Sequence, residues 1–315
     1  RVGYGSVVCR SSGRGVGNVK RETGCLVEGI RGRIVVMPIK TLLVQYEPQI
    51  EKVEENMKAV SGMLEKYSKA HQIDILMLSE TAFSGYVFKD LEHIRPFLER
   101  AEDGPTFRWC SEQAVRLGCY VISGFPEVRL DAEGKEHYLN SAHLIGRDGK
   151  SIGVYSKHFL YETDERWAEE GPGFAAYELK DLGIKLGLGI CMDINPCQFK
   201  APFDAYELAT FHEEQKVDIL ALSCAWCTHD DPKPDKVIMR ETTSYWLMRL
   251  EPMLRKRRVL FLAANRTGKE NGTQFVGCSA AIELDTIVGL AVATPTEQEV
   301  LEVEWDRDAP KRNYR

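Results

Sequence analysis

An internal repeat constrains the fold of this chain more than any other feature of its sequence. Segments in the first half of the 315 residues resemble segments in the second half, in the same order. The matching pairs are Ile39–Val44 with Ile184–Gly189, Ile73–Ser79 with Val217–Ser223, and Ser141–Ala142 with Ser279–Ala280. Because a repeat of this kind marks a duplicated structural unit, we expect two similar halves.

Each half alternates strand-like and helix-like segments. Short runs rich in Val, Ile and Leu at residues 41–45, 73–78 and 120–123 are typical of strands buried on both faces. Between the first two runs, residues 51–70 place apolar side chains at steps of three and four, which predicts an amphipathic helix. The alternation favours an α/β fold with sheets packed together and helices outside.

Charge divides the chain into two unlike parts. Residues 1–33 carry seven basic and two acidic side chains and eight of the 26 glycines, without a helix or strand period, and the first methionine is Met37. We expect residues 1–33 to be a disordered or extraneous basic leader, 34–305 a single domain and 306–315 a C-terminal tail. The formal net charge of −6 and the lack of a long apolar run argue against nucleic acid and membrane as partners.

The cysteines indicate the compartment. Their number, nine, is odd and their spacings show no disulfide framework, which favours a reducing, cytoplasmic location, although the Arg-rich leader leaves a mitochondrial one open. The one CxxC motif, Cys224–Cys227, has no second pair at zinc spacing. We therefore expect half-buried thiols there rather than a metal or redox site.

Three residues that can do chemistry follow predicted strands. Glu80 follows the run at 73–79, Lys157 follows 152–156 and Cys191 follows 184–190. In open α/β sheets, ligands bind beyond the carboxyl ends of strands. Taken singly, each residue is more often a solvated charge or a small buried hydrophobe. Together they supply the nucleophile, the base and the oxyanion-binding cation that amide hydrolysis by a thiol requires.

The segments around these residues resemble the motifs of the nitrilase, or carbon-nitrogen hydrolase, superfamily. The segments are Ser79–Tyr86, Tyr155–Leu160 and Gly189–Asp193, and the similarity covers roughly residues 34–305. The resemblance implies a four-layer αββα sandwich of two similar halves, with no metal or organic cofactor.

The same resemblance implies a role for each site residue. Glu80 would be the general base, Lys157 the oxyanion stabiliser and Cys191 the nucleophile, with the backbone N–H of Met192 as a second oxyanion donor. Relatives have a further glutamate that orders the site eight residues after the lysine, a position that Glu165 occupies here. A plain surface glutamate is the alternative for Glu165.

A narrower resemblance lies downstream of the nucleophile. The segments Cys191–Pro196, Ala264–Gly268 and Phe275–Ser279 are similar to the protein N-terminal amidases of fungi. This implies an enzyme of the Arg/N-degron pathway that deamidates N-terminal Asn and Gln of proteins or peptides to Asp and Glu, with release of ammonia, through a Cys191 thioester. Relatives pair through helical faces, so a homodimer is also open.

Such a substrate brings a free α-ammonium, which must meet a carboxylate or several carbonyls when it enters a dry pocket. The candidates are Asp193, close to the nucleophile, and Asp230 or Asp231, on a loop after a strand of the second half, of which we prefer Asp230. Their alternatives are a structural helix-start group for Asp193 and a hydrated turn for Asp230. Trp226 is a candidate wall of the pocket, or a core residue.

Three other functions compete with this interpretation. The first is a small-molecule amidase of the same superfamily, of the ω-amidase or carbamoylase type. The second is a papain-like Cys-His enzyme, although none of the seven histidines has that motif context. The third is a scaffold that lost its chemistry, which predicts an altered triad, whereas all three residues are present.

Overall fold

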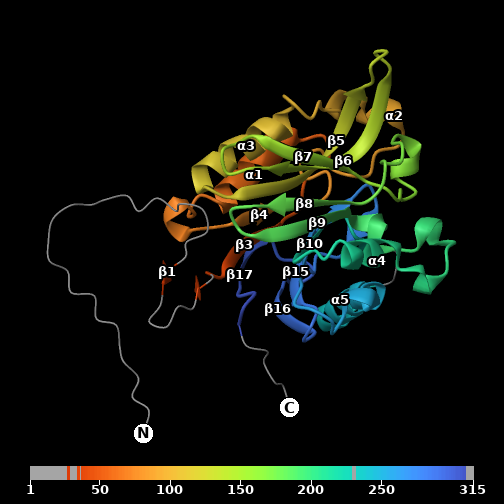
Figure 1. Ribbon diagram of the computed structural model, residues 1–315. Coiled ribbons are helices and arrows are strands. Elements are labelled where there is room, and N and C mark those ends of the chain that lie inside the picture. The colour runs from red at the N-terminus through yellow and green to blue at the C-terminus, as the bar shows by residue number, and fades with distance from the viewer. Residues whose placement is uncertain (1–26, 29–33, 36, 229–231, 310–315) are drawn as a thin grey trace, which may run out of the picture.

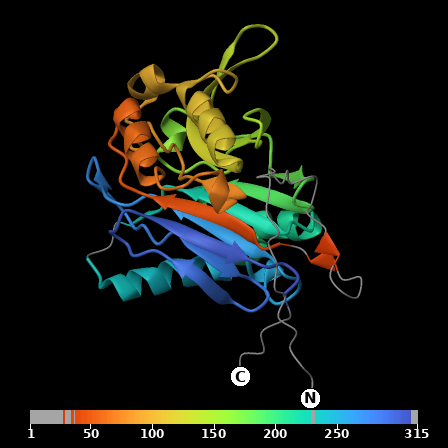
Figure 2. The same cartoon turned by 90° about the vertical axis from the view of Figure 1, so that its left-hand side faces the viewer.

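Two six-stranded sheets lie face to face with helices on both outer sides, which makes a four-layer αββα sandwich (Figures 1 and 2). The computed structural model describes residues 27–28, 34–35, 37–228 and 232–309. The first sheet has the order β17 (Glu299–Trp305), β3 (Ile39–Gln45), β4 (Ile75–Met77), β5 (Tyr120–Leu130), β6 (Glu136–Ile145), β7 (Ser151–Ser156). The second has the order β8 (Ala175–Leu179), β9 (Ile184–Ile190), β10 (Ile219–Cys224), β12 (Leu260–Asn265), β15 (Ala280–Glu283), β16 (Val288–Val292).

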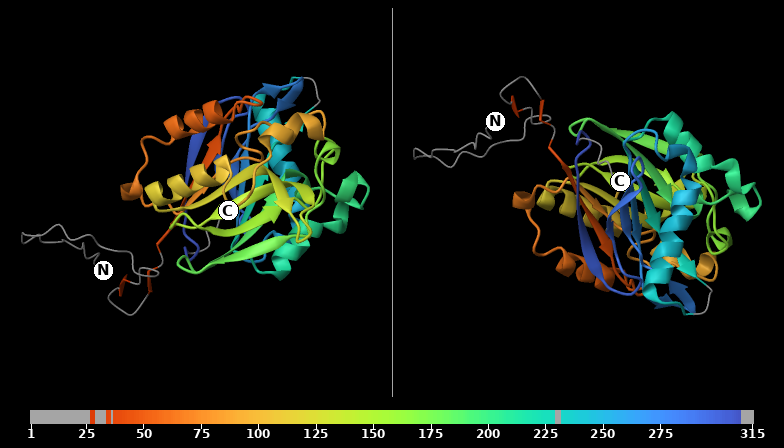
Figure 3. Two further views of the ribbon diagram at one scale, coloured as in Figure 1. Left: turned by 90° about the horizontal axis from the view of Figure 1, so that it is seen from above. Right: turned by 90° about the horizontal axis from the view of Figure 1, so that it is seen from below.

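The helices cover the two outer faces. Helices α1 (Val53–Met63) and α3 (Pro105–Leu117) lie over the first sheet, and α4 (Glu207–Glu214) and α5 (Asp235–Arg249) lie over the second, as Figure 3 shows. A short helix α2 (Leu91–Ile94) and a small sheet of β11 (Cys227–Thr228), β14 (Thr273–Phe275) and β13 (Lys269–Glu270) complete the body. Among the described residues, no helix has the length and apolarity needed to cross a bilayer.

The predicted duplication is confirmed strand by strand. Across each sheet the order is the same: an antiparallel edge strand, then three parallel strands, then two antiparallel strands. One hydrogen-bond motif also recurs: the Lys40 backbone N–H donates to Asp74 Oδ2 at 3.0 Å, and the Lys185 N–H donates to Asp218 Oδ2 at 2.8 Å. The repeat in the sequence is therefore a repeat in space.

The continuous apolar runs are explained by burial on both faces of each sheet. In β3, Leu43 faces the second sheet, while Leu42 and Val44 face the layer of α1 and α3. All three side chains are at most 1% exposed. Because neither face meets water, the strands lack the polar and apolar alternation of a half-exposed sheet.

Two sequence predictions differ from the structure. The helix expected over residues 51–70 ends at Met63, and Tyr67 reaches the core from the turn that follows it. Strand β1 (Val27–Glu28) pairs with β2 (Ile34–Val35), so regular structure occurs inside the expected leader. The other residues of 1–33 lie outside the described residues.

Packing between the sheets predicts a large effect of truncating Leu43. Leu43→Ala should lower the free energy of unfolding by about 2–5 kcal/mol, because it leaves a cavity that rigid strands cannot close. Leu130→Ala is the matched control, since Leu130 is 53% exposed on β5 and its truncation should cost less than about 0.5 kcal/mol. Urea unfolding measures both values. Equal effects in the two variants would contradict the sandwich core.

Candidate active site

Cys191, the predicted nucleophile, lies on a strained turn. Strand β9 ends at Ile190 and runs directly into a short 3-10 helix that begins at Cys191. Cys191 has φ +39°, a left-handed conformation that costs energy for any residue with a Cβ. The turn is stabilised by Asp193, whose Oδ2 accepts the Ile190 N–H at 2.8 Å. It places Cys191, a residue that is 8% exposed, in the wall of a pocket.

A close backbone approach places Glu80. The chain after β4 turns at Thr81. On either side of this turn, the Ala82 N–H donates to the Gly124 carbonyl and the Ser79 carbonyl accepts the Gly124 N–H. A Cβ on Gly124 would lie 2.5 Å from Thr81 N and 2.7 Å from Glu80 Cα, so only glycine fits there. The Glu80 N–H also donates to the Cys224 carbonyl at 3.3 Å. Glu80 thus lies where the two halves meet.

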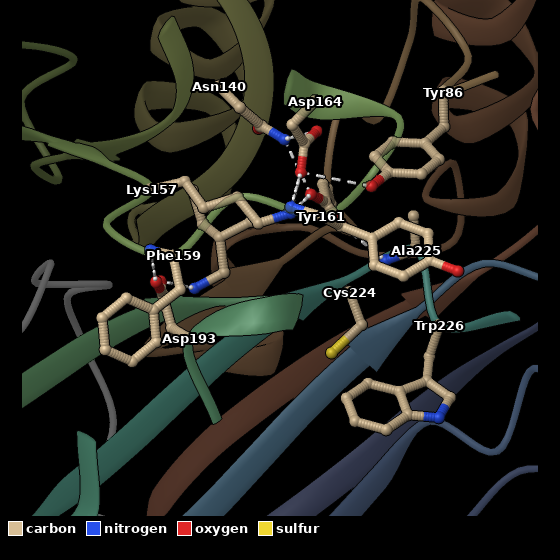
Figure 4. Close-up of polar contacts among 12 residues, drawn as sticks. Tyr86, Asn140, Lys157, Phe159, Tyr161, Asp164, Asp193, Cys224, Ala225 and Trp226 are labelled. Atoms are coloured by element: carbon tan, nitrogen blue, oxygen red, sulfur yellow. Dashed lines mark hydrogen bonds and ion pairs between the residues drawn. The ribbon is translucent and has the colours of Figure 1, made fainter. Parts of the chain in front are cut away.

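Lys157 connects the buried charges of the site. Its Nζ lies 2.6 Å from Glu80 Oε1 and 2.5 Å from Asp164 Oδ2, and all three side chains are 0% exposed. Asn140 donates from Nδ2 to both acids, at 2.7 Å to Glu80 Oε1 and 3.0 Å to Asp164 Oδ1 (Figure 4). The Ala225 N–H fixes the other oxygen of Glu80 at 2.8 Å.

This environment sets the charge of each group. Burial disfavours the ammonium, but the negative charges of Asp164 and Glu80 raise the pKa of Lys157 above its ordinary value, so it remains a cation. Burial raises the pKa of Glu80, an effect that Lys157 opposes and Asp164 reinforces. Hydrogen bonding with the Cys224 thiol, followed by burial, raises the pKa of Cys191, while Lys157 acts in the opposite direction. As a nucleophile, Cys191 would therefore start as a thiol and need a base.

The structure brings the three predicted catalytic residues into one site. Cys191 interacts electrostatically with both Glu80 and Lys157, and it lines the pocket together with Met192. The role of the Met192 backbone N–H as an oxyanion donor stays a prediction. Trp226 lines the same pocket and packs edge-on against Trp246 and at a tilt against Tyr245, so it is both wall and core.

The prediction that Glu165 orders the site is wrong. The Glu165 side chain is exposed, whereas Asp164, one residue earlier, is 0% exposed and contacts Lys157. A 3-10 turn begins at Asp164, and its carboxylate accepts the Tyr161 N–H at 3.0 Å, which turns this side chain inward. The sequence spacing predicted an acid at this place but not which of two neighbours.

The prediction that Asp193 binds the α-ammonium is also wrong. Its carboxylate is 0% exposed and accepts four hydrogen bonds, which use its acceptor sites. The donors are the Tyr155 hydroxyl and the N–H groups of His158, Phe159 and Ile190. The alternative, a structural group, is confirmed, since Asp193 connects the turn of the nucleophile to the loop after Lys157. Asp230 lies outside the described residues.

Sequence reasoning missed Asn140 and Tyr86. Asn140 lies within strand β6, and the only signal was an amide in a buried strand, which must find partners. Tyr86 lies at the end of the Ser79–Tyr86 motif, and its hydroxyl donates to Asp164 Oδ2 at 3.3 Å. Neither contact could be derived from the sequence, because both depend on where Asp164 lies in the fold.

The pocket beside the nucleophile has a volume of about 860 Å³. Six aromatic side chains contribute to its lining: Tyr86, Tyr161, Phe199, Trp226, Tyr245 and Phe275. Charged residues line it as well: Asp235, Glu241, Lys233 and Lys269. Within the described ranges, no group of three His, Cys, Asp or Glu could hold a metal ion.

The base distinguishes this site from that of a papain-like enzyme. Among the described residues that line the pocket there is no histidine, and the proton acceptor available to Cys191 is the Glu80 carboxylate. With Lys157 as a fixed cation, the arrangement defines a cysteine-dependent hydrolase of carbon–nitrogen bonds. A sequence profile of the carbon-nitrogen hydrolases matches residues 41–311, and the chain belongs to that family.

Comparison with known proteins adds closer relatives. The chain is 38% identical to Protein N-terminal amidase of Schizosaccharomyces pombe over 258 residues, which cover 76% of this chain and 90% of the relative. It is 30% identical to Protein N-terminal amidase of Saccharomyces cerevisiae over 225 residues, 64% of this chain and 48% of that longer relative. A crystal structure of an N-terminal amidase with an Asn-Glu-Ala peptide shares the fold, with a TM-score of 0.74 at 21% identity over 85% of this chain and 97% of the other.

Removing the charge of Asp164 should impair catalysis. We expect Asp164→Asn to lower kcat by about 10- to 100-fold, because Lys157 loses a partner that holds its ammonium in place. Glu165→Gln, a change of the same kind at the exposed neighbour, should keep the wild-type rate. Ammonia release from an amide substrate measures both. Equal losses in the two variants would contradict the role of Asp164.

The pH dependence of kcat should report the protonation of Glu80. Because Glu80 accepts a proton only as a carboxylate, kcat should fall as the pH drops through its pKa, which burial raises above the ordinary value of 4.5. In Asp164→Asn this acidic limb should move to lower pH, since the neighbouring negative charge that raises the pKa of Glu80 is gone. Initial rates against pH measure the limb, and an unshifted or opposite movement would exclude Glu80 as its origin.

Proposed function

We propose that this protein removes the side-chain amide of Asn and Gln at the N-termini of proteins and peptides, releasing ammonia and leaving Asp or Glu. The observation that carries the proposal is the Glu80, Lys157 and Cys191 site in a chain that shares 38% identity with a Protein N-terminal amidase over 90% of that relative. Solved N-terminal amidases with Asn-Glu and Gln-Val peptides support it further.

The proposed reaction begins at the thiol. Glu80 takes the proton of Cys191, and the thiolate attacks the side-chain carboxamide carbon of the substrate. The ammonium of Lys157, which is buried and positioned in advance by two acids, stabilises the oxyanion together with the Met192 N–H. Glu80 then gives its proton to the departing ammonia, leaving a thioester on Cys191.

The second half of the reaction uses the same base. Glu80 removes a proton from water, which attacks the thioester carbonyl, and Lys157 again stabilises the oxyanion. Collapse of this intermediate releases the new carboxylic acid and returns the proton to Cys191. Hydrogen bonds from Asn140 and Ala225 hold both oxygens of Glu80 in place through the two steps.

The dimensions of the pocket favour a peptide over a free amino acid. Its volume of about 860 Å³ exceeds what one Asn or Gln side chain fills, and it extends from Cys191 along α5 to Asp235 at the start of that helix. Aromatic walls suit the side chains of a polypeptide. Asp235 and Glu241 are the acids among the described lining residues, so they join Asp230 as candidate partners of the α-ammonium.

The cellular setting is part of the same proposal. The described cysteines are free thiols, which suits a reducing compartment, and we place the enzyme in the cytoplasm. There its products, N-terminal Asp and Glu, would enter the Arg/N-degron pathway. A homodimer stays a prediction.

Peptides that differ only at the N-terminus test the proposal. The purified protein is incubated with peptides that begin with Asn, Gln or acetylated Asn, and with free asparagine and glutamine, while ammonia and peptide mass are measured. We expect turnover of the first two peptides alone, and none by Cys191→Ala. Turnover confined to free amino acids would favour a small-molecule amidase, and equal turnover of acetylated Asn would exclude an α-ammonium anchor.

A further inference from the structure

A buried ion pair next to the pocket takes no part in the mechanism described above. Arg266 Nη1 lies 2.7 Å from Glu270 Oε2, and the two side chains are 0% and 2% exposed. Arg266 also donates to the Pro48 carbonyl at 3.0 Å and lies 3.9 Å from the centroid of the Phe275 ring. Because it contacts both the Pro48 segment and the hairpin of β13 and β14, the guanidinium is fixed in place, and with it the carboxylate of Glu270.

The second oxygen of Glu270 connects the two halves of the molecule. Glu270 lies on β13 in the second half, and its Oε1 accepts the N–H of Tyr86 at 2.8 Å and also the N–H of Val87. The next residue, Asn271, donates to the Val87 carbonyl at 3.0 Å. Hydrogen bonds to a charged carboxylate are about twice as strong as neutral ones. Glu270 therefore fixes the backbone of the loop that follows Glu80.

Tyr86 transmits this constraint to the catalytic charges. Its ring lies edge-on against Phe275, with centroids 6.2 Å apart, and lines the pocket. Its hydroxyl donates to Asp164 Oδ2 at 3.3 Å, the oxygen that also contacts Lys157 Nζ, and that nitrogen lies 5.7 Å from the ring centroid (Figure 4). A shift of the Tyr86 backbone would therefore change the surroundings of Lys157.

We propose that Glu270, held by Arg266, is a positioning residue that fixes Tyr86 so that Asp164 and Lys157 keep the geometry required for oxyanion stabilisation. The proposal rests on the proposed function for its assay substrate. Glu270 contacts neither the Cys191 thiol nor the Glu80 carboxylate, so its effect on the chemical step is indirect. The influence of Glu270 passes through the Tyr86 hydroxyl, which the change Tyr86→Phe removes.

The test compares Glu270→Gln, Tyr86→Phe and the double variant on an N-terminal Asn peptide. We expect each single change to lower kcat by about 10- to 100-fold with KM changed by less than about threefold. The double variant should lose no more than Glu270→Gln alone, because both changes interrupt one path. Glu283→Gln is the matched control: Glu283 is also buried and ion-paired, to Arg258 at 2.7 Å, but its hydrogen bonds go to Arg258, Thr286 and Trp305 rather than to Tyr86. This control should lose stability and keep kcat.

Two outcomes would overturn the proposal. One is a Glu270→Gln protein that loses stability as Glu283→Gln does and keeps kcat; the other is a double variant whose losses multiply. If Glu270→Gln does not fold, Glu270→Asp keeps the charge and carries the same test. Alkylation of Cys191 by iodoacetamide, followed by peptide mapping, separates this inference from the proposed function. Alkylation needs no substrate, and Lys157 lowers the pKa of the Cys191 thiol. A displaced Lys157 therefore leaves less thiolate, so a slower alkylation rate in Glu270→Gln supports the positioning role even if no peptide is turned over.

Discussion

The structure of this site depends on one buried ammonium. Lys157 has no contact with water, and a desolvated cation persists only where opposite charges and hydrogen bonds compensate it. Glu80 and Asp164 provide the charges, and Asn140 holds both acids in register. The same arrangement positions Glu80 and Lys157 for their proposed roles as base and oxyanion-binding cation. The ion pairs that keep Lys157 charged are therefore the same contacts that hold it in position.

The duplicated fold explains why such a cluster forms at one place. Strands β4 and β10 are equivalent in the repeat, and the chains that leave them meet where the Glu80 N–H donates to Cys224 and the Ala225 N–H donates to Glu80. The repeat also makes Tyr46 the counterpart of Cys191, and Tyr46 is a buried tyrosine that donates to the Ala82 carbonyl. The two halves share a backbone plan, but only one set of strand ends carries a nucleophile. Duplication thus accounts for the shared backbone, and single-residue differences such as Tyr46 and Cys191 account for the difference in chemistry.

The sequence predicted the strands, the duplication and the positions of Glu80, Lys157 and Cys191 at strand ends, because each depends on local patterns: apolar runs, a recurring order and polar residues after strands. It failed where the outcome depends on the direction of one side chain. Glu165 and Asp164 are adjacent acids, and a single 3-10 turn decides which one points inward. Asp193 lies close to Cys191 in the sequence, yet four donors from two segments, residues 155–159 and Ile190, occupy its carboxylate. Three of these donors lie more than 30 residues away in the sequence, so a local window of residues could not reveal them.

What the sequence by itself determined is the class of the protein: an αββα sandwich with a glutamate, a lysine and a cysteine at the carboxyl ends of strands. Tertiary structure decided which groups surround them. Asn140, Asp164 and Tyr86 come from three separate segments, and Glu270 reaches Tyr86 from the other half of the chain. The physical reason is that burial makes each polar atom seek a partner in space, and the partner available depends on how the layers pack rather than on neighbours along the chain.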